Sequence, residues 1–378
     1  MDFYLDSEQT QIKQMAEEFA KEKLEPYAGE WDSKEYFPVD VMREAAQLGF
    51  AGLFIKEEFG GCNLTRLHGA LIFEALSYGC VATSAYLSIH NMVGGMIQKF
   101  GSAKQQAQWL PKLSSLEWLS SYCLTEPSSG SDAASLKTRA IRDGDHYVIN
   151  GSKAFISGAG VSDLYVVMVR TGDDGPKGIS TVVIEKGTRG LSFGKPEEKM
   201  GWKSQPTCVV NFDNCRVPIE NRLGEEGDGF KIAMTGLDGG RINIAACSLG
   251  GAQRGLDLTK SYIKERQQFG QNLASFQSVQ FKIADMETQL SAARLMVHRA
   301  GFMVSKGDPN ATQYCAMAKQ FATDVGSAVV NEALQIHGGY GYIKEYQIER
   351  LVRDLRVHQI LEGTNEIMRV IIARKVLG

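Results

Sequence analysis

The sequence predicts a multidomain α+β protein in which two helical regions flank a central region of strands. Its 378 residues exceed one typical domain of about 150 residues, so two or three domains are expected. Five of the nine prolines stand between positions 127 and 218, and proline is excluded from helix interiors. The spacing of hydrophobic residues changes from helical to strand-like and back at about the same places.

Residues 1–117 predict an N-terminal α-helical domain. Ile12, Met15, Ala16, Phe19 and Ala20 recur at the spacing of one apolar helix face, and a proline at position 26 ends the pattern. Only three prolines occur in the whole segment, which favours further helices after the first.

Residues 118–225 predict a middle domain of strands. The runs 164–169, 179–184 and 207–212 are short, rich in β-branched residues and bounded by Gly, Asp or Pro. No helical pattern of 10–15 residues separates them, so an antiparallel barrel or sandwich is favoured over a parallel dinucleotide-binding sheet.

Residues 226–378 predict a C-terminal bundle of long helices. One seam of apolar side chains repeats in steps of four and three, and a second helix repeats the pattern over residues 314–328. The first seam comprises Val279, Ile283, Met286, Leu290, Ala293 and Val297.

Composition excludes several classes of protein. A net charge of −3, from 41 basic and 44 acidic residues, offers no basic excess for nucleic acid. Seven scattered cysteines without a Cys-x-x-Cys pair predict reduced packing residues and no metal site. The longest apolar stretch, residues 48–55, is too short to span a membrane, and the acidic N-terminus resembles neither a secretory signal nor a transit peptide. We therefore expect a cytosolic or already processed chain.

Motifs for phosphate binding and for hydrolysis are missing. The chain has neither Gly-x-Gly-x-x-Gly nor Gly-x-Ser-x-Gly, which disfavours a nicotinamide dehydrogenase and a serine hydrolase. Three polar clusters remain, at residues 122–132, 335–341 and 358–366. The first fits a plain turn or a ligand loop, and the second fits a glycine helix stop or exposed backbone donors.

The third cluster places a carboxylate just before a helix. Thr364 is positioned to cap a terminal helix, which leaves Glu362 on the preceding loop with Gly363 beside it. Such a glutamate is either a partner of the helix dipole or, in a buried apolar cleft, a general base with a raised pKa. The residues alone leave both interpretations open.

These clusters, in this order, closely resemble the acyl-CoA dehydrogenase family over nearly the whole chain. The matching motifs are Leu48–Leu53, Glu58–Gly61, Leu124–Pro127, Arg266–Gly270, Gln335–Gly341 and Glu362–Thr364. The resemblance implies an N-terminal α-helical domain, a middle antiparallel β-barrel, a C-terminal four-helix bundle, bound FAD and usually a homotetramer.

The resemblance also implies a mechanism. Glu362 occupies the place of the family's base, which removes the α-proton of an acyl-CoA while the β-hydrogen leaves as hydride to the flavin. Some relatives carry the base at the position of Gly240 instead, so glycine there leaves Glu362 as the sole candidate.

The cofactor and substrate residues follow from the same resemblance. In one subunit FAD is expected to contact Tyr122, Leu124, Thr125, Ser131, Phe155, Ser157, Thr364 and Glu366. A neighbouring subunit is expected to contribute Arg266, Phe269, Gln277, Gln335, Gly338 and Gly339. The substrate is expected to contact Arg241 at the CoA adenosine end, far from the reacting bond, with Asp238 nearby and Ser131 near the pantetheine.

Two positions depart from the family pattern. Ser128 replaces a usual glycine, which would shift the flavin loop if that backbone needs a positive φ. Phe155-Ile-Ser157 replaces the commoner Trp-Ile-Thr, which keeps an aromatic wall and a hydroxyl beside the flavin but changes their size.

Segments 154–160, 201–207 and 239–245 look most like the family members that oxidise isobutyryl-CoA. The implied reaction converts isobutyryl-CoA to methacrylyl-CoA in valine catabolism, with electrons passed to electron-transferring flavoprotein, in the mitochondrial matrix or a bacterial cytoplasm. 2-Methylbutyryl-CoA or a straight short chain stays open, because a pocket discriminates one methylene by only about 1–3 kcal/mol.

Other classes are weighed against this one. An acyl-CoA oxidase is expected to carry a further C-terminal domain, and a nitroalkane oxidase an aspartate at position 362. A DNA-binding flavoprotein is expected to carry a basic C-terminal extension. A helical scaffold without a ligand is the remaining alternative, and it would stay colourless with added FAD.

Overall fold

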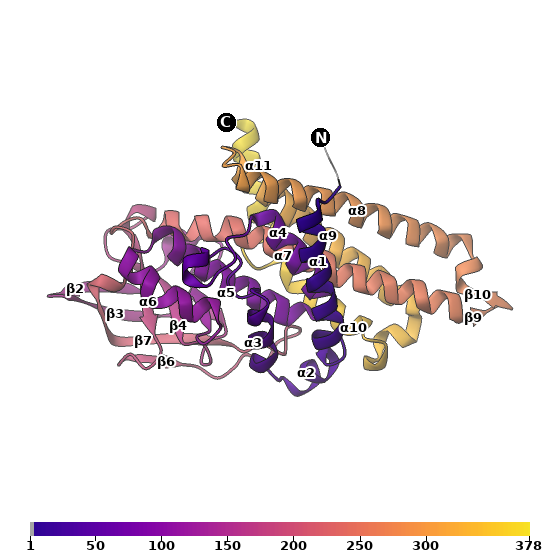
Figure 1. Cartoon of the computed structure of the whole chain (residues 1–378), viewed down its shortest axis with the longest axis horizontal. Helices are drawn as coiled ribbons and strands as arrows, with labels where there is room; N and C mark the ends of the chain where they lie inside the picture. Colours follow the sequence, from indigo (N-terminus) through magenta and orange to yellow (C-terminus); the bar gives the residue numbers. More distant parts are fainter. Residues whose placement is uncertain (1–3) are drawn as a thin grey trace.

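In the computed structural model, which describes residues 4–378, helices come before and after a central stretch of strands in the sequence, and the sheet lies toward one end of the molecule (Figure 1). Before the sheet come α1 (Ser7–Phe19), α2 (Ala28–Lys34), α3 (Val39–Gln47), α4 (Arg66–Gly79), α5 (Val81–Phe100) and α6 (Ala103–Ser114). After it come α7 (Gly229–Glu265), α8 (Gln277–Ser305), α9 (Ala311–His337), α10 (Ile348–Arg356) and α11 (Asn365–Leu377).

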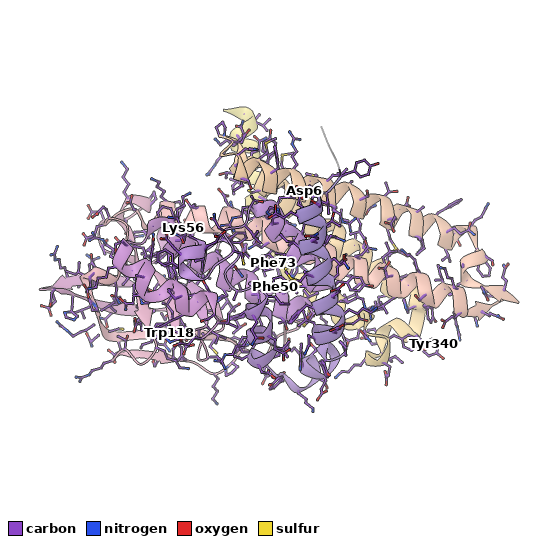
Figure 2. The ribbon with its side chains drawn as sticks, in the orientation of Figure 1. Asp6, Phe50, Lys56, Phe73, Trp118 and Tyr340 are labelled. Carbon is purple, nitrogen blue, oxygen red and sulfur yellow. The ribbon has the colours of Figure 1, made fainter. Side chains whose placement is uncertain are left out.

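The N-terminal helices form around the predicted apolar stripe. Asp6 caps α1 with a reciprocal capping box, and Ala16 and Phe19 are buried on its inner face. A π-helical turn, Ala20–Leu24, continues the helix to just before the proline that the sequence marked as its end. Figure 2 shows Phe50 and Phe73 inside this helical region, where both belong to the largest buried apolar cluster.

The middle region contains the predicted strands. They are β1 (Ser120–Cys123), β2 (Arg139–Asp143), β3 (His146–Ser157), β4 (Leu164–Arg170), β5 (Ile179–Glu185), β6 (Leu191–Phe193), β7 (Thr207–Pro218) and β8 (Arg222–Leu223). The sheet order is β6-β7-β3-β2-β4-β5-β8, with β1 also paired to β4. The three runs predicted as strands correspond to β4, β5 and the first half of β7.

The sequence predicted antiparallel strand pairing, but two of the strand pairs are parallel. β1 lies parallel to β4 over four residues, and β2 meets β4 in parallel through the single pair Arg139 and Arg170. Parallel neighbours need a long crossover between them. The β2–β3 hairpin supplies that crossover, because it lies between β1 and β4 in the sequence.

The long C-terminal helices carry the predicted seam. Met286, Leu290, Ala293 and Val297 are buried on α8, and α7 packs against α9, α4, α5 and α8. The far ends of α7 and α8 reach the tip of the molecule, where β9 (Gln267–Gln268) and β10 (Gln271–Asn272) form a hairpin (Figure 1). The strands β1 to β8 lie within residues 120–223, and α7 begins at Gly229. The predicted domain boundaries, after residue 117 and after residue 225, stay a prediction.

The cysteines have the structural state that the sequence predicts. All seven are free thiols, and all but Cys62 are buried. They contribute to packing as small apolar side chains.

Candidate active site

Glu362 stands on a tight loop between the 3₁₀ turn Val357–Gln359 and α11. Its backbone has φ 56°, and Gly363 follows with φ 90°. Thr364 then caps α11 by accepting a hydrogen bond from the Ile367 amide at 3.3 Å. A positive φ is costly for a residue with a Cβ, and such strain gathers where surrounding structure fixes a functional side chain.

The carboxylate of Glu362 lies against a glycine of α7. A Cβ added to Gly240 would stand 2.0 Å from Oε2 and 2.7 Å from Oε1 of Glu362. No side chain at position 240 could share this space with the carboxylate, so glycine at this position leaves the room that the Glu362 side chain occupies.

Burial changes the acid strength of Glu362. The Oε2 atom is buried and has no hydrogen-bond partner within residues 4–378. Burial raises the pKa of Glu362 to about 7, against the opposing charges of Arg241, Lys319 and Arg66. A carboxylate that is about half ionised at neutral pH can accept and later release a proton, so the interpretation as a general base is favoured over that of a dipole partner.

The structure places Arg241 next to Glu362, closer to the reacting end than the sequence predicted. Its Nε donates to the backbone oxygen of Glu362 at 3.3 Å, and its Nη1 donates to Asp238 at 2.7 Å. Asp238 also accepts a hydrogen bond from Thr312 at 2.6 Å. The Arg241 and Asp238 side chains thus form a pair that supports the base loop from α7.

Lys319 supports the same loop from α9. Its buried ammonium donates to the Gly363 backbone oxygen and to Asn365 Oδ1, both at 2.8 Å. Burial lowers the pKa of Lys319 to about 8. Gly363 and Asn365 stand on either side of Thr364 in the chain. By binding both, Lys319 fixes the turn that directs Glu362 inward.

Two segments of the sheet form one edge of the predicted flavin site. The Tyr122–Thr125 segment and the end of β3 lie side by side: the Ala154 amide donates to the Thr125 backbone oxygen at 2.9 Å, and Ser121 Oγ donates to the Ser157 backbone oxygen at 2.6 Å. The predicted contacts Tyr122, Leu124, Thr125, Phe155 and Ser157 therefore come together.

A buried ion pair stabilises this edge of the predicted flavin site. Lys153, with a fully buried side chain on β3, donates to Glu126 at 2.8 Å and to the Leu124 backbone oxygen at 3.0 Å. Glu126 also accepts from the backbone amides of Lys137 and Thr138. Hydrogen bonds on every side satisfy the pair, which a buried charge requires.

Phe155 presents an open aromatic face at this edge. Its backbone has φ 58° and its side chain is 69% exposed. Ser128, in contrast, does not have a positive φ, so the shift of the loop that glycine replacement could have caused does not arise. Ser131 lies exposed on the loop that follows β1.

Tyr122, one of the predicted flavin contacts, is close enough to Glu362 for the two groups to interact electrostatically. Burial raises the pKa of its phenol well above the usual value, and the next largest cause is the charge of Glu362. Its hydroxyl is 3.5 Å from the Ala233 backbone oxygen on α7. The Glu362 loop, which Thr364 and Glu366 follow, therefore lies near the predicted flavin contact Tyr122.

The second set of predicted flavin residues lies at the other end of the long helices. It comprises Arg266, Phe269, Gln277, Gln335, Gly338 and Gly339. Arg266 follows α7 and lies over the Tyr340 ring at 5.2 Å, and Figure 2 shows Tyr340 near the hairpin end of the molecule. The helix from Gly240 to Arg266 spans roughly 39 Å at 1.5 Å per residue, so one chain does not bring the two sets together.

The hairpin end carries an apolar side chain that is unusually exposed to solvent. Phe269 is 93% exposed and has φ 52°. α9 ends at His337, and a Cβ added to the next residue, Gly338, would meet nothing within 4 Å. The glycine helix stop predicted from the sequence is confirmed.

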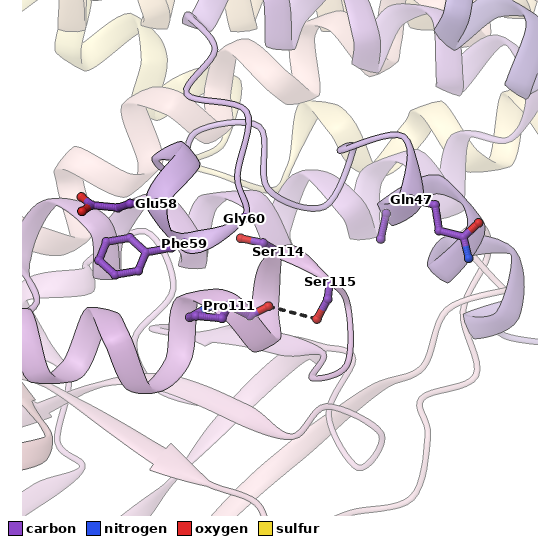
Figure 3. A pocket seen from close by; sticks show the side chains of 8 residues that line it. Gln47, Glu58, Phe59, Gly60, Pro111, Ser114 and Ser115 are labelled. Atoms are coloured by element: carbon purple, nitrogen blue, oxygen red, sulfur yellow. Dashed lines mark hydrogen bonds between the residues drawn. The ribbon is translucent and has the colours of Figure 1, made fainter.

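One surface hollow lies apart from this site. A cavity of about 450 Å³ lies between α3, the 3₁₀ turn Glu57–Phe59 and α6 (Figure 3). Its lining includes Gln47, Glu58, Ser114 and Ser115 but none of the predicted site residues. Across residues 4–378 we find no cluster of metal-ligating side chains and no helix long and apolar enough to cross a membrane.

Comparison with protein families decides the classification. Three models match in chain order: the acyl-CoA dehydrogenase N-terminal domain over residues 6–117, the middle domain over 121–215 and the C-terminal domain over 227–377. The chain belongs to the acyl-CoA dehydrogenase family. It is an oxidoreductase that acts on a CH–CH group, and the fold predicted from the sequence is confirmed.

Relatives within the acyl-CoA dehydrogenase family are similar over nearly the whole chain. The mitochondrial isobutyryl-CoA dehydrogenase of Dictyostelium discoideum is 56% identical, covering 98% of this chain and 90% of its own length. The corresponding protein of Bos taurus is 55% identical, covering 99% and 90%.

Solved structures agree with this membership. Butyryl-CoA dehydrogenase from Megasphaera elsdenii superposes with a TM-score of 0.97 at 39% identity, over 100% of both chains. A chain from a structure of the electron-transferring flavoprotein of Acidaminococcus fermentans has the same TM-score at 42% identity, over 100% of both chains. The FAD complex of PigA has a TM-score of 0.96 at 32% identity, covering 100% of this chain and 99% of its own.

FAD is the cofactor that this membership supports, and the residues present fit it. Phe155 offers an exposed ring, and Ser157 and Thr125 offer hydroxyl groups on the adjoining backbone. At the hairpin end Gly338 and Gly339 leave their backbone open to close approach.

Three charged residues near the candidate site were not predicted from the sequence. Lys153, Lys319 and Arg66 are single charged residues inside a strand or helices, and no motif distinguishes them from surface charges. Only the tertiary structure shows that their charged groups are enclosed. Helical spacing gives one weak signal, because Lys319 falls in the buried register of α9 with Cys315 and Ala322.

Proposed function

We propose that this chain oxidises a short branched-chain acyl-CoA, converting isobutyryl-CoA to methacrylyl-CoA. The observation that carries the proposal is the Glu362 carboxylate, buried against Gly240 with a pKa of about 7. Two isobutyryl-CoA dehydrogenases that match the chain at 55% and 56% identity support the choice of ester.

In the proposed reaction Glu362 removes the α-proton of the thioester. The C–H electron pair at the α-carbon becomes the new C=C bond, and the proton stays on the Glu362 carboxyl group. When bound, FAD supplies the acceptor for the hydride that leaves the β-carbon. The backbone N–H of Glu362 polarises the thioester carbonyl, as the family resemblance implies.

The other chain residues position these groups. Lys319 and Thr364 hold the base loop, and the Lys153–Glu126 pair holds the flavin edge. We assign FAD to the predicted contacts in two sets, of which the set at Arg266 serves a neighbouring copy. The separation of the two sets within one chain calls for at least a second copy, and we propose the homotetramer that the family resemblance implies.

We also propose a physiological setting. Electrons pass from the reduced cofactor to electron-transferring flavoprotein, and the reaction belongs to valine degradation. The mitochondrial matrix and a bacterial cytoplasm are both compatible with this role, and relatives from Dictyostelium discoideum and Bos taurus are described as mitochondrial.

The decisive experiment is anaerobic bleaching of the flavin absorbance by four esters. Isobutyryl-CoA, 2-methylbutyryl-CoA, butyryl-CoA and octanoyl-CoA are titrated separately into the purified yellow protein. We expect isobutyryl-CoA to bleach the flavin fastest. Faster bleaching by butyryl-CoA or 2-methylbutyryl-CoA would keep the family and replace the substrate. The butyryl-CoA dehydrogenase that shares this fold makes butyryl-CoA the second candidate.

The Glu362→Gln variant tests the base in the same assay. We expect it to keep FAD and bind the ester while flavin reduction falls by several orders of magnitude, because glutamine accepts no proton. Substantial bleaching by this variant would assign the base to another residue.

A further inference from the structure

Arg66, the first residue of α4, directs its guanidinium group into the interior of the molecule. The Cζ atom lies 3.7 Å from the centre of the Phe54 ring. A Cβ added to Gly239 would be 2.6 Å from Cζ, so the guanidinium group lies directly on α7. Behind it, Gly301 of α8 approaches the Arg66 backbone closely enough that a Cβ there would be at 3.2 Å.

This guanidinium group and the Glu362 carboxylate occupy neighbouring places on one helix. Gly239 and Gly240 are consecutive residues of α7, and the first is covered by Arg66 and the second by Glu362. Two oppositely charged groups therefore share one enclosed space without a hydrogen bond between them. The Nη1 atom of Arg66 and Oε2 of Glu362 are both buried and unpartnered within residues 4–378.

Three cations face Glu362, and they differ in what neutralises them. Arg241 opposes the burial of Glu362 most strongly of the three, and it is itself paired with Asp238 at 2.7 Å. Lys319 donates to Gly363 and to Asn365, and its pKa is lowered to about 8. Arg66 has no carboxylate within ion-pair distance across the described residues, and burial lowers its pKa only to about 10.

We propose that Arg66 is a positioning residue whose unneutralised charge acts together with Arg241 and Lys319 to favour the proton-accepting form of the Glu362 carboxylate. The proposal rests on the proposed role of Glu362 as the base. The titratable and charged groups that face Glu362 are Arg66 from α4, Tyr122 from β1, Arg241 and Cys247 from α7, and Lys319 from α9. Among them Arg66 alone is a full cation without a protein partner for its inner nitrogen.

The test is the pH profile of flavin reduction by isobutyryl-CoA in the holoenzyme. Loss of a nearby positive charge disfavours the anion, so Arg66→Gln should move the rising limb of the profile about one unit to higher pH. With a base that is half ionised at pH 7, this shift makes the variant about fivefold slower at pH 7 and nearly equal to wild type at pH 9.

Two further variants separate charge from packing. Arg66→Lys restores a cation and should return the profile toward that of wild type. Arg299→Gln removes an exposed charge from the neighbouring helix α8 and should leave the profile in place, because solvent screens that group. A uniform loss of rate at every pH in Arg66→Gln, or an unshifted profile, would overturn the proposal. Should Arg66→Gln not fold, Arg66→Met, which keeps an apolar stem on Phe54, carries the same test.

An infrared titration without substrate gives an independent measurement. The carboxylic-acid band of Glu362 is identified by its loss in Glu362→Gln, and its midpoint should rise in Arg66→Gln. If no ester bleaches the wild-type flavin, the proposed function fails while this titration still tests Arg66. If esters bleach the flavin but the midpoint does not move, the inference about Arg66 fails alone.

Discussion

Glu362 combines a strained backbone with a costly location for its charge. Its φ of 56° and its buried, unpartnered Oε2 both work against stability. The loop keeps this arrangement because Lys319, Arg241 and Thr364 fix the backbone on either side. Strain and burial of this kind are features of catalytic positions rather than of packing positions.

A substitution at Gly240 tests the fit of the carboxylate. In Gly240→Ala the new Cβ would collide with Oε2, so we expect Glu362 to be displaced and flavin reduction to fall at least 100-fold, by analogy with misplaced reacting groups. Stopped-flow flavin reduction measures this loss. Gly255→Ala on the same helix is the control, because its Cβ would meet Val330 at 3.2 Å, and it should retain activity. Equal activity in both variants would contradict the fit.

The raised pKa of Glu362 also predicts a pH-dependent stability. The folded protein holds this proton up to about pH 7, whereas the unfolded chain loses it near pH 4.5. Stability from this group is therefore present below pH 4.5 and is lost as pH rises to 7. Glu362→Gln should gain about 3 kcal/mol relative to wild type between pH 4.5 and 8, at about 1.4 kcal/mol per pKa unit. Urea unfolding of both proteins across this range measures the difference, and a constant difference would contradict the prediction.

At the scale of elements, the flavin edge depends on one buried ion pair between β3 and the loop after β1. Removing the lysine alone would leave Glu126 buried without its main partner. Lys153→Met should therefore destabilise the protein by about 3–5 kcal/mol and weaken FAD retention. Denaturant unfolding and flavin absorbance after gel filtration measure the two effects.

The surface pair Lys104–Glu220 gives the matched control. Both of its side chains are well exposed, so Lys104→Met should cost less than about 1 kcal/mol and keep FAD. Similar losses from the two lysine variants would show that the buried pair has no special role.

The elements also show what could be predicted from the sequence. β4 and β5 were predictable because both are short, β-branched and fully enclosed, so composition and boundaries agree. The parallel pairing of β1 with β4 was not, because strand order depends on contacts between segments far apart in the chain. Glu362 was identified by its motif, whereas Arg66 and Lys319 became recognisable only through the packing of α7 against α4 and α9.

At the scale of the whole molecule, the separation of the two predicted cofactor sets has a testable outcome. Arg266 lies at the hairpin end, far from Glu362 in the same chain, yet we propose that it contacts the FAD of a neighbouring copy. Arg266→Gln should therefore weaken FAD binding at least tenfold while leaving the pKa of Glu362 unchanged. Arg142→Gln, an exposed substitution on β2, should leave FAD binding unchanged.

The measurement is FAD release on dilution, followed by flavin fluorescence together with light scattering. In wild type we expect release of FAD to follow dissociation of the oligomer, because the second set of predicted contacts would depart with the neighbour. Tight FAD binding by a monomer, or by Arg266→Gln, would contradict a shared cofactor.

α7 is one uninterrupted helix, so its length fixes the distance between the two predicted cofactor sets. Loss of one residue between Gly240 and Arg266 would shorten the distance by about 1.5 Å and rotate the far end by about 100°. A loop absorbs such a change, but a straight helix transmits it fully to the hairpin. An inserted or deleted residue should therefore be tolerated in a turn such as residues 171–178, whereas in this helix it would change the spacing between the two predicted cofactor sets.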